Sequence, residues 1–233
     1  HTFRENARVA ERVMDSRAFL DLKALPDRLL ILGGGVIGCE FACMAAALGT
    51  RVTVVEMLED IVMVLDRDVR RVLRKRMETL GVTLLTGAPL TGIAVKDGTV
   101  SGMYKDQAVT GDLLLVAVGR RPNTAALDLA RAGVKVDERG TIPVDAQGRT
   151  NVASIFAVGD LVTGSLQLAH AATQQGVAAA EAAAGMKSAV EKVCPSCIFT
   201  SPEIGLAGLT EAKAQQLGRT VKPAIFPFSA LGN

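Results

Sequence analysis

Apolar residues in the first 120 positions come in short continuous runs, separated by turns rich in glycine, proline and aspartate. Such runs are typical of strands buried on both faces of a parallel sheet. They predict strands at residues 28–32, 52–56 and 113–118. Helices are predicted at the alanine-rich residues 39–48 and from Asp66 or Asp68 to residue 80, because each stretch ends at a glycine.

The second of these helices has one apolar side and one strongly basic side. Its arginines are predicted to form a solvated face, while its apolar residues point inward. The predicted inward residues are Val69, Val72, Leu73, Met77 and Leu80.

From residue 82 the pattern changes to that of strands, predicted at 82–85, 90–95 and 99–104, with a hairpin turn at 96–98. Strands that alternate with helices indicate an α/β fold with a Rossmann-like, doubly wound parallel sheet. The strands from residue 82 on predict a small antiparallel insertion in that fold.

Outside this region the pattern is weaker. Only a faint helical spacing is present at 7–14. Beyond residue 120 we expect a short helix at 123–132, a buried strand at 155–158 and a helix at 168–184, followed by a linker at 185–190.

Charge and composition narrow the class of partner. The 233 residues carry 26 lysines and arginines against 24 acidic residues, which gives no electrostatic case for nucleic acid or an anionic membrane. The sequence contains no apolar run of ~18 residues, so no membrane span is predicted. Four cysteines are too few for a disulfide scaffold, which indicates a reducing, cytoplasmic compartment. The start at His1 and the end without a closing helix lead us to expect a piece of a longer protein.

The strongest motif is the glycine-rich turn Gly33–Gly38, which matches G-x-G-x-x-G between a strand and a helix. Gly33 would make the tight turn, Gly35 would let a pyrophosphate approach, and Gly38 would let helix and strand pack closely. Glu56 follows 23 residues after Gly33, the spacing of a ribose-binding acid, and a carboxylate there favours NAD over NADP. The alternative is a glycine turn that only packs.

Several spaced motifs resemble the flavoprotein disulfide reductase family, most closely its dihydrolipoyl dehydrogenase members. The matching segments, in chain order, are SRAFLDLKALP, GGGVIGCEFA, VGRRPN, TNVASIFAVGD, LAHA and FTSPEIGLAGLTE.

The resemblance implies a division of the chain and a set of cofactor contacts. Residues 1–24 would end an FAD domain, 25–146 would form the NAD-binding domain, 147–189 would return to the FAD domain, and 190–233 would begin a dimer-interface domain. The NAD contacts implied are Gly33, Gly34, Gly35, Val36, Ile37, Gly38, Glu56, Leu90, Ala117, Val118, Gly119 and Arg120.

On the FAD side, the resemblance assigns Asp160 to a ribityl hydroxyl and Ala169, near the start of the next helix, to the flavin. The simpler interpretation of Asp160 is a helix cap. Glu40 would be a supporting catalytic residue, and its alternative is favourable charge at a helix N-terminus.

The remaining cysteines and histidines are interpreted as structural. Cys39 and Cys43 do not have the family's C-x-x-x-x-C spacing and are expected to be core residues. Cys194 and Cys197 have C-x-x-C spacing, but without a second pair no metal site is predicted and linker cysteines are the favoured interpretation. His170 is expected to pack near the flavin, and the family's His-Glu pair is not found.

The implied function is the NAD-binding portion of an enzyme that passes electrons from dihydrolipoamide through a disulfide and FAD to NAD. The whole protein would be a homodimer that serves a lipoyl-bearing component of a 2-oxoacid dehydrogenase complex, and this chain alone would be inactive. Two alternatives stay open: another NAD(P)H-dependent member of the family, and a non-catalytic dinucleotide-binding module.

Overall fold

The computed structural model describes residues 11–188, 190 and 193–230. The described chain divides into two units. The first contains the described residues up to Gly119 with 197–205 and those from Leu209 on, and the second contains Arg120–Ser196 with 206–208. Each unit is described by itself.

The first unit is built on a five-stranded parallel sheet of order β1-β8-β2-β3-β4. This sheet confirms the predicted α/β class. Its strands are β1 (Val13–Met14), β2 (Arg28–Leu32), β3 (Arg51–Glu56), β4 (Thr83–Thr86) and β8 (Leu113–Val116).

Both faces of the sheet are apolar, which explains the continuous runs in the sequence. The register places Leu30 beside Leu114 and Ile31 beside Val54 and Leu115. Residues in register share a face, and alternate residues point to opposite faces. The face that includes Leu29, Ile31, Val52, Val54, Leu113 and Leu115 is fully buried.

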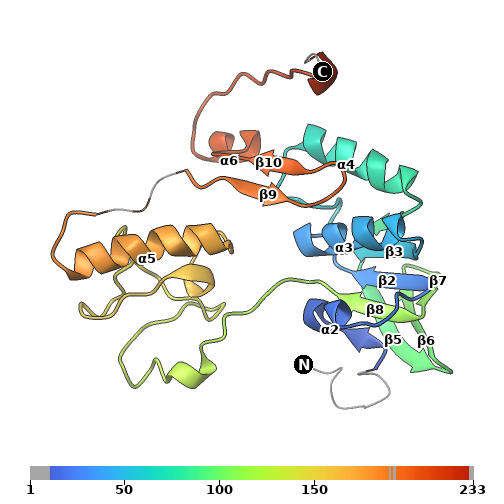
Figure 1. Cartoon of the computed structure of the whole chain (residues 1–233), viewed down its shortest axis with the longest axis horizontal. Coiled ribbons are helices and arrows are strands. Elements are labelled where there is room, and N and C mark those ends of the chain that lie inside the picture. Colours follow the sequence, from blue (N-terminus) through green and yellow to red (C-terminus); the bar gives the residue numbers. More distant parts are fainter. Residues whose placement is uncertain (1–10, 189, 191–192, 231–233) are drawn as a thin grey trace. The chain divides into compact units, whose positions relative to one another are not determined.

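Helices cover this face of the sheet. Figure 1 shows α3 (Val36–Ala47) and α4 (Arg67–Thr79) on the same side of β2 and β3. The short helix α2 (Ser16–Leu20) begins at Asp15, whose carboxylate accepts from Ala18 N at 2.9 Å. Its Phe19 packs edge-on against Phe41 of α3, with ring centroids 5.2 Å apart.

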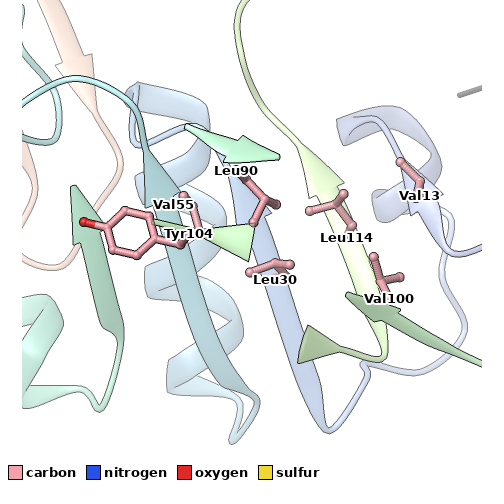
Figure 2. Close-up of a cluster of buried hydrophobic side chains, with 7 residues drawn as sticks. All are labelled: Val13, Leu30, Val55, Leu90, Val100, Tyr104 and Leu114. Atoms are coloured by element: carbon pink, nitrogen blue, oxygen red, sulfur yellow. The ribbon is translucent and has the colours of Figure 1, made fainter. Parts of the chain in front are cut away.

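The opposite face is covered by a three-stranded antiparallel sheet of β5 (Leu90–Lys96), β6 (Thr99–Tyr104) and β7 (Gln107–Gly111). Figure 2 shows where the two sheets meet. The cluster between them consists of Val13, Leu30, Val55, Leu90, Val100, Tyr104 and Leu114. The predicted insertion is therefore confirmed, and the structure adds β7, a short and mostly exposed strand at the sheet edge that the sequence prediction missed because it has no continuous apolar run.

The prediction for α4 was wrong in part. Leu73 and Met77 are fully buried, whereas Val69 and Val72 are exposed. Arg70 and Arg74 are not part of a solvated face, because they lie largely buried against Asp60 and form ion pairs with its carboxylate.

The second unit contains little regular structure. It has short 3-10 turns at Ala125–Leu127 and Gly159–Leu161 and one long helix, α5 (Ala169–Ala183), close to the predicted 168–184. The helix expected at 123–132 shrinks to the first of these turns. The strand expected at 155–158 is not formed: Phe156 makes a single bridge to Arg149. The apolar residues there pack instead into a small cluster of Val134, Ile142, Ala157 and Val162.

Beyond α5 the elements are short. They are β9 (Ser196–Ile198), its partner β10 (Ile204–Leu206), α6 (Glu211–Gln216) and a 3-10 turn at Phe228–Ala230. Of the weak helix at 7–14, residues 7–10 lie outside the described residues, and 11–14 form a turn and strand β1.

Two features are absent from the described residues. No helix there is long and apolar enough to cross a membrane. Within the same part of the chain, no group of three or more His, Cys, Asp or Glu side chains is placed to hold a metal ion.

Candidate functional site

The glycine-rich turn connects β2 to α3 at the carboxyl edge of the parallel sheet. Gly33 has φ +110°, and a Cβ on it would lie 2.5 Å from the carbonyl oxygen of Ala117 in the segment after β8. A Cβ on Gly38 would lie 1.9 Å from the carbonyl oxygen of Gly33. Only glycine fits at these two positions, so the turn is shaped by close backbone packing.

Gly35 differs from these two glycines. A Cβ there would meet nothing within 4 Å, so its outer side is open space. Gly35 is also the N-cap of α3, and it has no side chain to accept from the first N–H groups of that helix. An open helix N-terminus with free N–H donors is a suitable place for an anionic group.

The Glu56 carboxylate lies beside this turn. Its Oε2 accepts from Gly34 N at 2.6 Å and its Oε1 accepts from Leu58 N at 2.8 Å. Both oxygens are therefore held in place by backbone donors. Each keeps acceptor capacity for a further hydrogen bond, because a carboxylate offers about four acceptor sites.

The loop at residues 57–66 packs against the same turn at Gly34. Val62 N donates to Gly34 O at 2.8 Å, and the Cys39 thiol donates to the same oxygen at 3.4 Å. The neighbouring Ile61 is fully buried against Gly34. Val62 adopts φ +42°, which is strained for a β-branched residue and is maintained by these contacts.

Asp60 anchors this loop to α4. Its Oδ2 accepts from Arg70 Nη1 at 2.9 Å, and its Oδ1 accepts from Arg74 Nη2 at 2.7 Å. Burial acts to raise the pKa of Asp60, but the hydrogen bonds from Arg74 and Ile61 and the arginine charges outweigh it, so the pKa lies below its usual range. This cluster was not predicted from the sequence. The only signal was the i, i+4 spacing of the two arginines, which does not identify their partner.

The segment after β8 approaches the turn, as expected of neighbouring parallel strands. Ala117 N donates to Leu32 O at 2.8 Å, Val118 is exposed, and Gly119 has φ +113°. Leu90 is placed differently. Its side chain lies in the core between the two sheets, so only its backbone is left to contact a nucleotide.

In the second unit, Asp160 lies in the 3-10 turn Gly159–Leu161, which a loop connects to α5. Gly159 N donates to Gln175 Oε1 at 2.6 Å, and Gln175 Nε2 donates to Ser165 Oγ at 2.9 Å. Gln175 of α5 thus fixes both ends of the loop that carries Asp160, a role the sequence did not reveal. Asp160 Oδ2 lies 3.6 Å from Arg120 Nη1, and the first residue of α5 is Ala169.

Glu40, His170 and the cysteines have partners of other kinds. Glu40 Oε1 accepts from Phe199 N at 2.8 Å, so the carboxylate joins α3 to the segment after β9. His170 Nε2 lies 2.7 Å from Pro195 O. Cys39 and Cys43 are buried free thiols whose pKa is raised by burial, while Cys194 is partly exposed and Cys197 exposed.

Taken together, the fold and site define an α/β protein with a glycine-rich turn, an adjoining acid and an open helix N-terminus at one edge of a parallel sheet. Residues 4–176 match the model of the pyridine nucleotide-disulphide oxidoreductases, and residues 194–233 match that family's dimerisation domain. The chain therefore belongs to this family of flavoprotein disulfide reductases.

The chain is also similar to curated proteins named dihydrolipoyl dehydrogenase. The chain is 42% identical to the dihydrolipoyl dehydrogenase of Chlamydia pneumoniae over 224 residues, which cover 96% of this chain and 48% of that protein. It is 39% identical to the enzyme of the same name from Geobacillus stearothermophilus, over 97% of this chain and 49% of the relative.

A solved structure of the HOCl-induced flavoprotein disulfide reductase from Escherichia coli matches with a TM-score of 0.85 and 32% identity. The match covers 94% of this chain and 51% of that chain. The chain thus spans about half the length of the relatives it matches.

Proposed function

We propose that the chain is the NAD-binding portion of a dihydrolipoyl dehydrogenase. In the whole protein a dithiol substrate would be oxidised to a disulfide, while NAD⁺ would gain a hydride and one proton would be released. The observation that supports this proposal is the glycine-rich turn, in which Gly35 faces open space and Glu56 lies beside Gly34. When bound, the flavin and the nicotinamide supply the redox chemistry, and the protein supplies binding and electrostatics.

The residues at the turn fit a dinucleotide. The N–H groups of Val36, Ile37 and Gly38 at the start of α3 would hold a pyrophosphate, for which Gly35 leaves room. Gly33 and Gly34 would shape this cradle, and the two oriented oxygens of Glu56 would accept from the ribose hydroxyls. The same carboxylate would repel a 2′-phosphate, so we propose NAD as the nucleotide.

The other predicted contacts complete the proposal. The segment after β8, from Ala117 through the exposed Val118 and Gly119 to Arg120, would approach the nicotinamide half. Asp160 would accept from a ribityl hydroxyl of FAD, and the N-terminus of α5 at Ala169 would favour negative charge on the flavin.

We further propose that this chain alone does not turn over lipoamide. Cys39 and Cys43 are buried with raised pKa values, whereas a redox pair needs accessible, low-pKa thiols. The whole protein would be a cytoplasmic homodimer that serves the lipoyl-bearing component of a 2-oxoacid dehydrogenase complex. Glu40 would support the site by holding the segment after β9 against α3. We also propose the domain boundaries that the sequence implies, with the FAD domain ending at residue 24, the NAD-binding domain at 146 and the returning FAD segment at 189.

Calorimetric titration of the 233-residue chain with NAD⁺ tests the proposal. We expect weak to moderate binding, little flavin absorbance after purification and no lipoamide turnover. Glu56→Arg should raise the ratio of NADP to NAD affinity by ~10-fold, while weakening both, because Gly34 N loses its acceptor.

Glu138→Arg makes the same charge change on an exposed residue of the second unit and should leave the ratio unchanged. An unaltered ratio in Glu56→Arg would remove the role assigned to Glu56, and lipoamide turnover by the wild-type chain would contradict the proposed inactivity. Binding without turnover also fits the alternative of a non-catalytic module, so assay of the whole protein with dihydrolipoamide decides between them.

A further inference from the structure

Asp60 and its two partners, Arg70 and Arg74, lie at the carboxyl edge of the parallel sheet, where Glu56 also lies. Arg74 Nη2 contacts Thr86 Oγ1 at 3.3 Å, and Thr86 is in register with Glu56 in the adjacent strand. On the other side, Ile61, which follows Asp60, packs against Gly34 of the turn. The ion-pair cluster is therefore one side chain away from Glu56.

The carboxylates in this cluster offset the charges of the arginines. Arg70 and Arg74 contribute two positive charges, Asp60 and Glu56 contribute two negative charges, and Glu78 Oε1 lies 3.7 Å from Arg74 Nη1. Arg70 is only 13% exposed in its side chain, and its buried Nε finds no acceptor among the described residues. Arg70 thus keeps a donor without a partner, and guanidinium groups are well suited to phosphate.

We propose that Asp60 is a determinant of nucleotide specificity, because it neutralises two arginines that would otherwise attract a 2′-phosphate to the ribose of the bound nucleotide. In this arrangement Glu56 excludes the phosphate directly, and Asp60 withholds the cations that would compensate for it. The inference rests on the proposed dinucleotide function of the turn.

A merely structural role for Asp60 makes a different prediction. If Asp60 only held the loop at residues 57–66 in place, its loss would lower the affinity for both nucleotides by the same factor. The ratio of NADP to NAD affinity is therefore the discriminating quantity. It is also insensitive to partial unfolding, because a reduced binding-competent fraction scales both apparent affinities equally.

The test is a pair of titrations of the 233-residue chain with NADP⁺ and NAD⁺, made on the wild type and Asp60→Asn. We expect the NADP to NAD affinity ratio to rise about fivefold to tenfold in Asp60→Asn at low salt, and less at high salt. Asp68→Asn is the matched control. It removes the same charge from α4, where Asp68 pairs with the exposed Arg71 at 3.5 Å, and it should leave the ratio unchanged.

A second variant assigns the effect to the arginines. Adding Arg74→Gln to Asp60→Asn should cancel most of the rise in the NADP to NAD affinity ratio. A ratio in Asp60→Asn within twofold of the wild-type value would overturn the inference while leaving the proposed function intact. Failure of the wild-type chain to bind either nucleotide would overturn the proposed function and this inference with it.

Discussion

The two candidate cofactor turns, at Gly33–Gly38 and Gly159–Leu161, share one hydrogen-bond arrangement but lie in different surroundings. In each, a buried glycine N–H donates to a side-chain oxygen at 2.6 Å: Gly34 to Glu56, and Gly159 to Gln175. The first turn follows β2, a strand paired on both sides in a parallel sheet that is packed on both faces. The second lies among isolated bridges and a small apolar cluster.

The two turns therefore differ in the interactions that fix their conformation. In the first unit, backbone segments approach so closely that the space itself sets the conformation. In the second unit, individual side chains such as Gln175 and Asp137 bind loop N–H groups that no strand partner reaches. We therefore expect the first turn to be sensitive to added atoms and the second to lost hydrogen bonds.

The largest effect is expected from Gly38→Ala. The new Cβ would lie 1.9 Å from the carbonyl oxygen of Gly33, which belongs to the backbone and cannot move without disturbing the sheet. We expect the first unit to lose about 3 kcal/mol of stability, measured by urea denaturation. A loss below about 1 kcal/mol would show that the turn is looser than its geometry indicates.

The corresponding change in the second unit is Gln175→Leu, which leaves the buried Gly159 N–H without an acceptor. It should cost about 1–3 kcal/mol, with faster hydrogen exchange at Gly159. Gln175→Glu retains an acceptor oxygen and should recover most of the loss. Equal damage from both variants would mean that packing, not the hydrogen bond, holds the turn.

Gly35→Ala sharpens the comparison within the first turn itself. Because a Cβ there meets nothing within 4 Å, stability should change by less than about 1 kcal/mol. Under the proposed function, however, the methyl group occupies the pyrophosphate space and NAD⁺ binding should be lost. Retained binding in this variant would place the pyrophosphate elsewhere.

The smallest effect concerns pH and the second unit. Hydrogen bonds from the Thr141 hydroxyl and N–H, with those from Thr163 and Arg139, lower the pKa of Asp137 from 3.8 to about 2. A lowered pKa stabilises the folded state above pH 3.8, and the contribution is lost as the pH falls through about 2.

Asp137→Asn should therefore lower the melting temperature by a constant amount at pH 5–7. The difference from the wild type should shrink below about pH 4 and vanish below about pH 2, as followed by thermal melts. A difference that is as large at pH 2 as at pH 5–7 would mean that the carboxylate charge is not what stabilises the loop.

The central strands β2 and β8 of the parallel sheet could be predicted because burial on both faces gives them continuous apolar runs, whereas the two-residue strand β1 was not predicted. Strand β2 at 28–32 and strand β6 of the antiparallel sheet at 99–104 were predicted to the residue, and the start of α5 to within one. Apolarity alone misled at residues 155–158, because a buried loop with its own hydrogen bonds has the same composition as a buried strand.

The amino-acid sequence by itself determined the α/β class, the glycine turn and the position of Glu56, since each depends on residue types at short, fixed spacings. Only the tertiary structure decided that Asp60 neutralises Arg70 and Arg74, that Gln175 holds the Asp160 loop, and that the side chain of Leu90 belongs to the core. These facts depend on side chains that meet across elements, and no local pattern of hydrophobicity or spacing records which partners will meet.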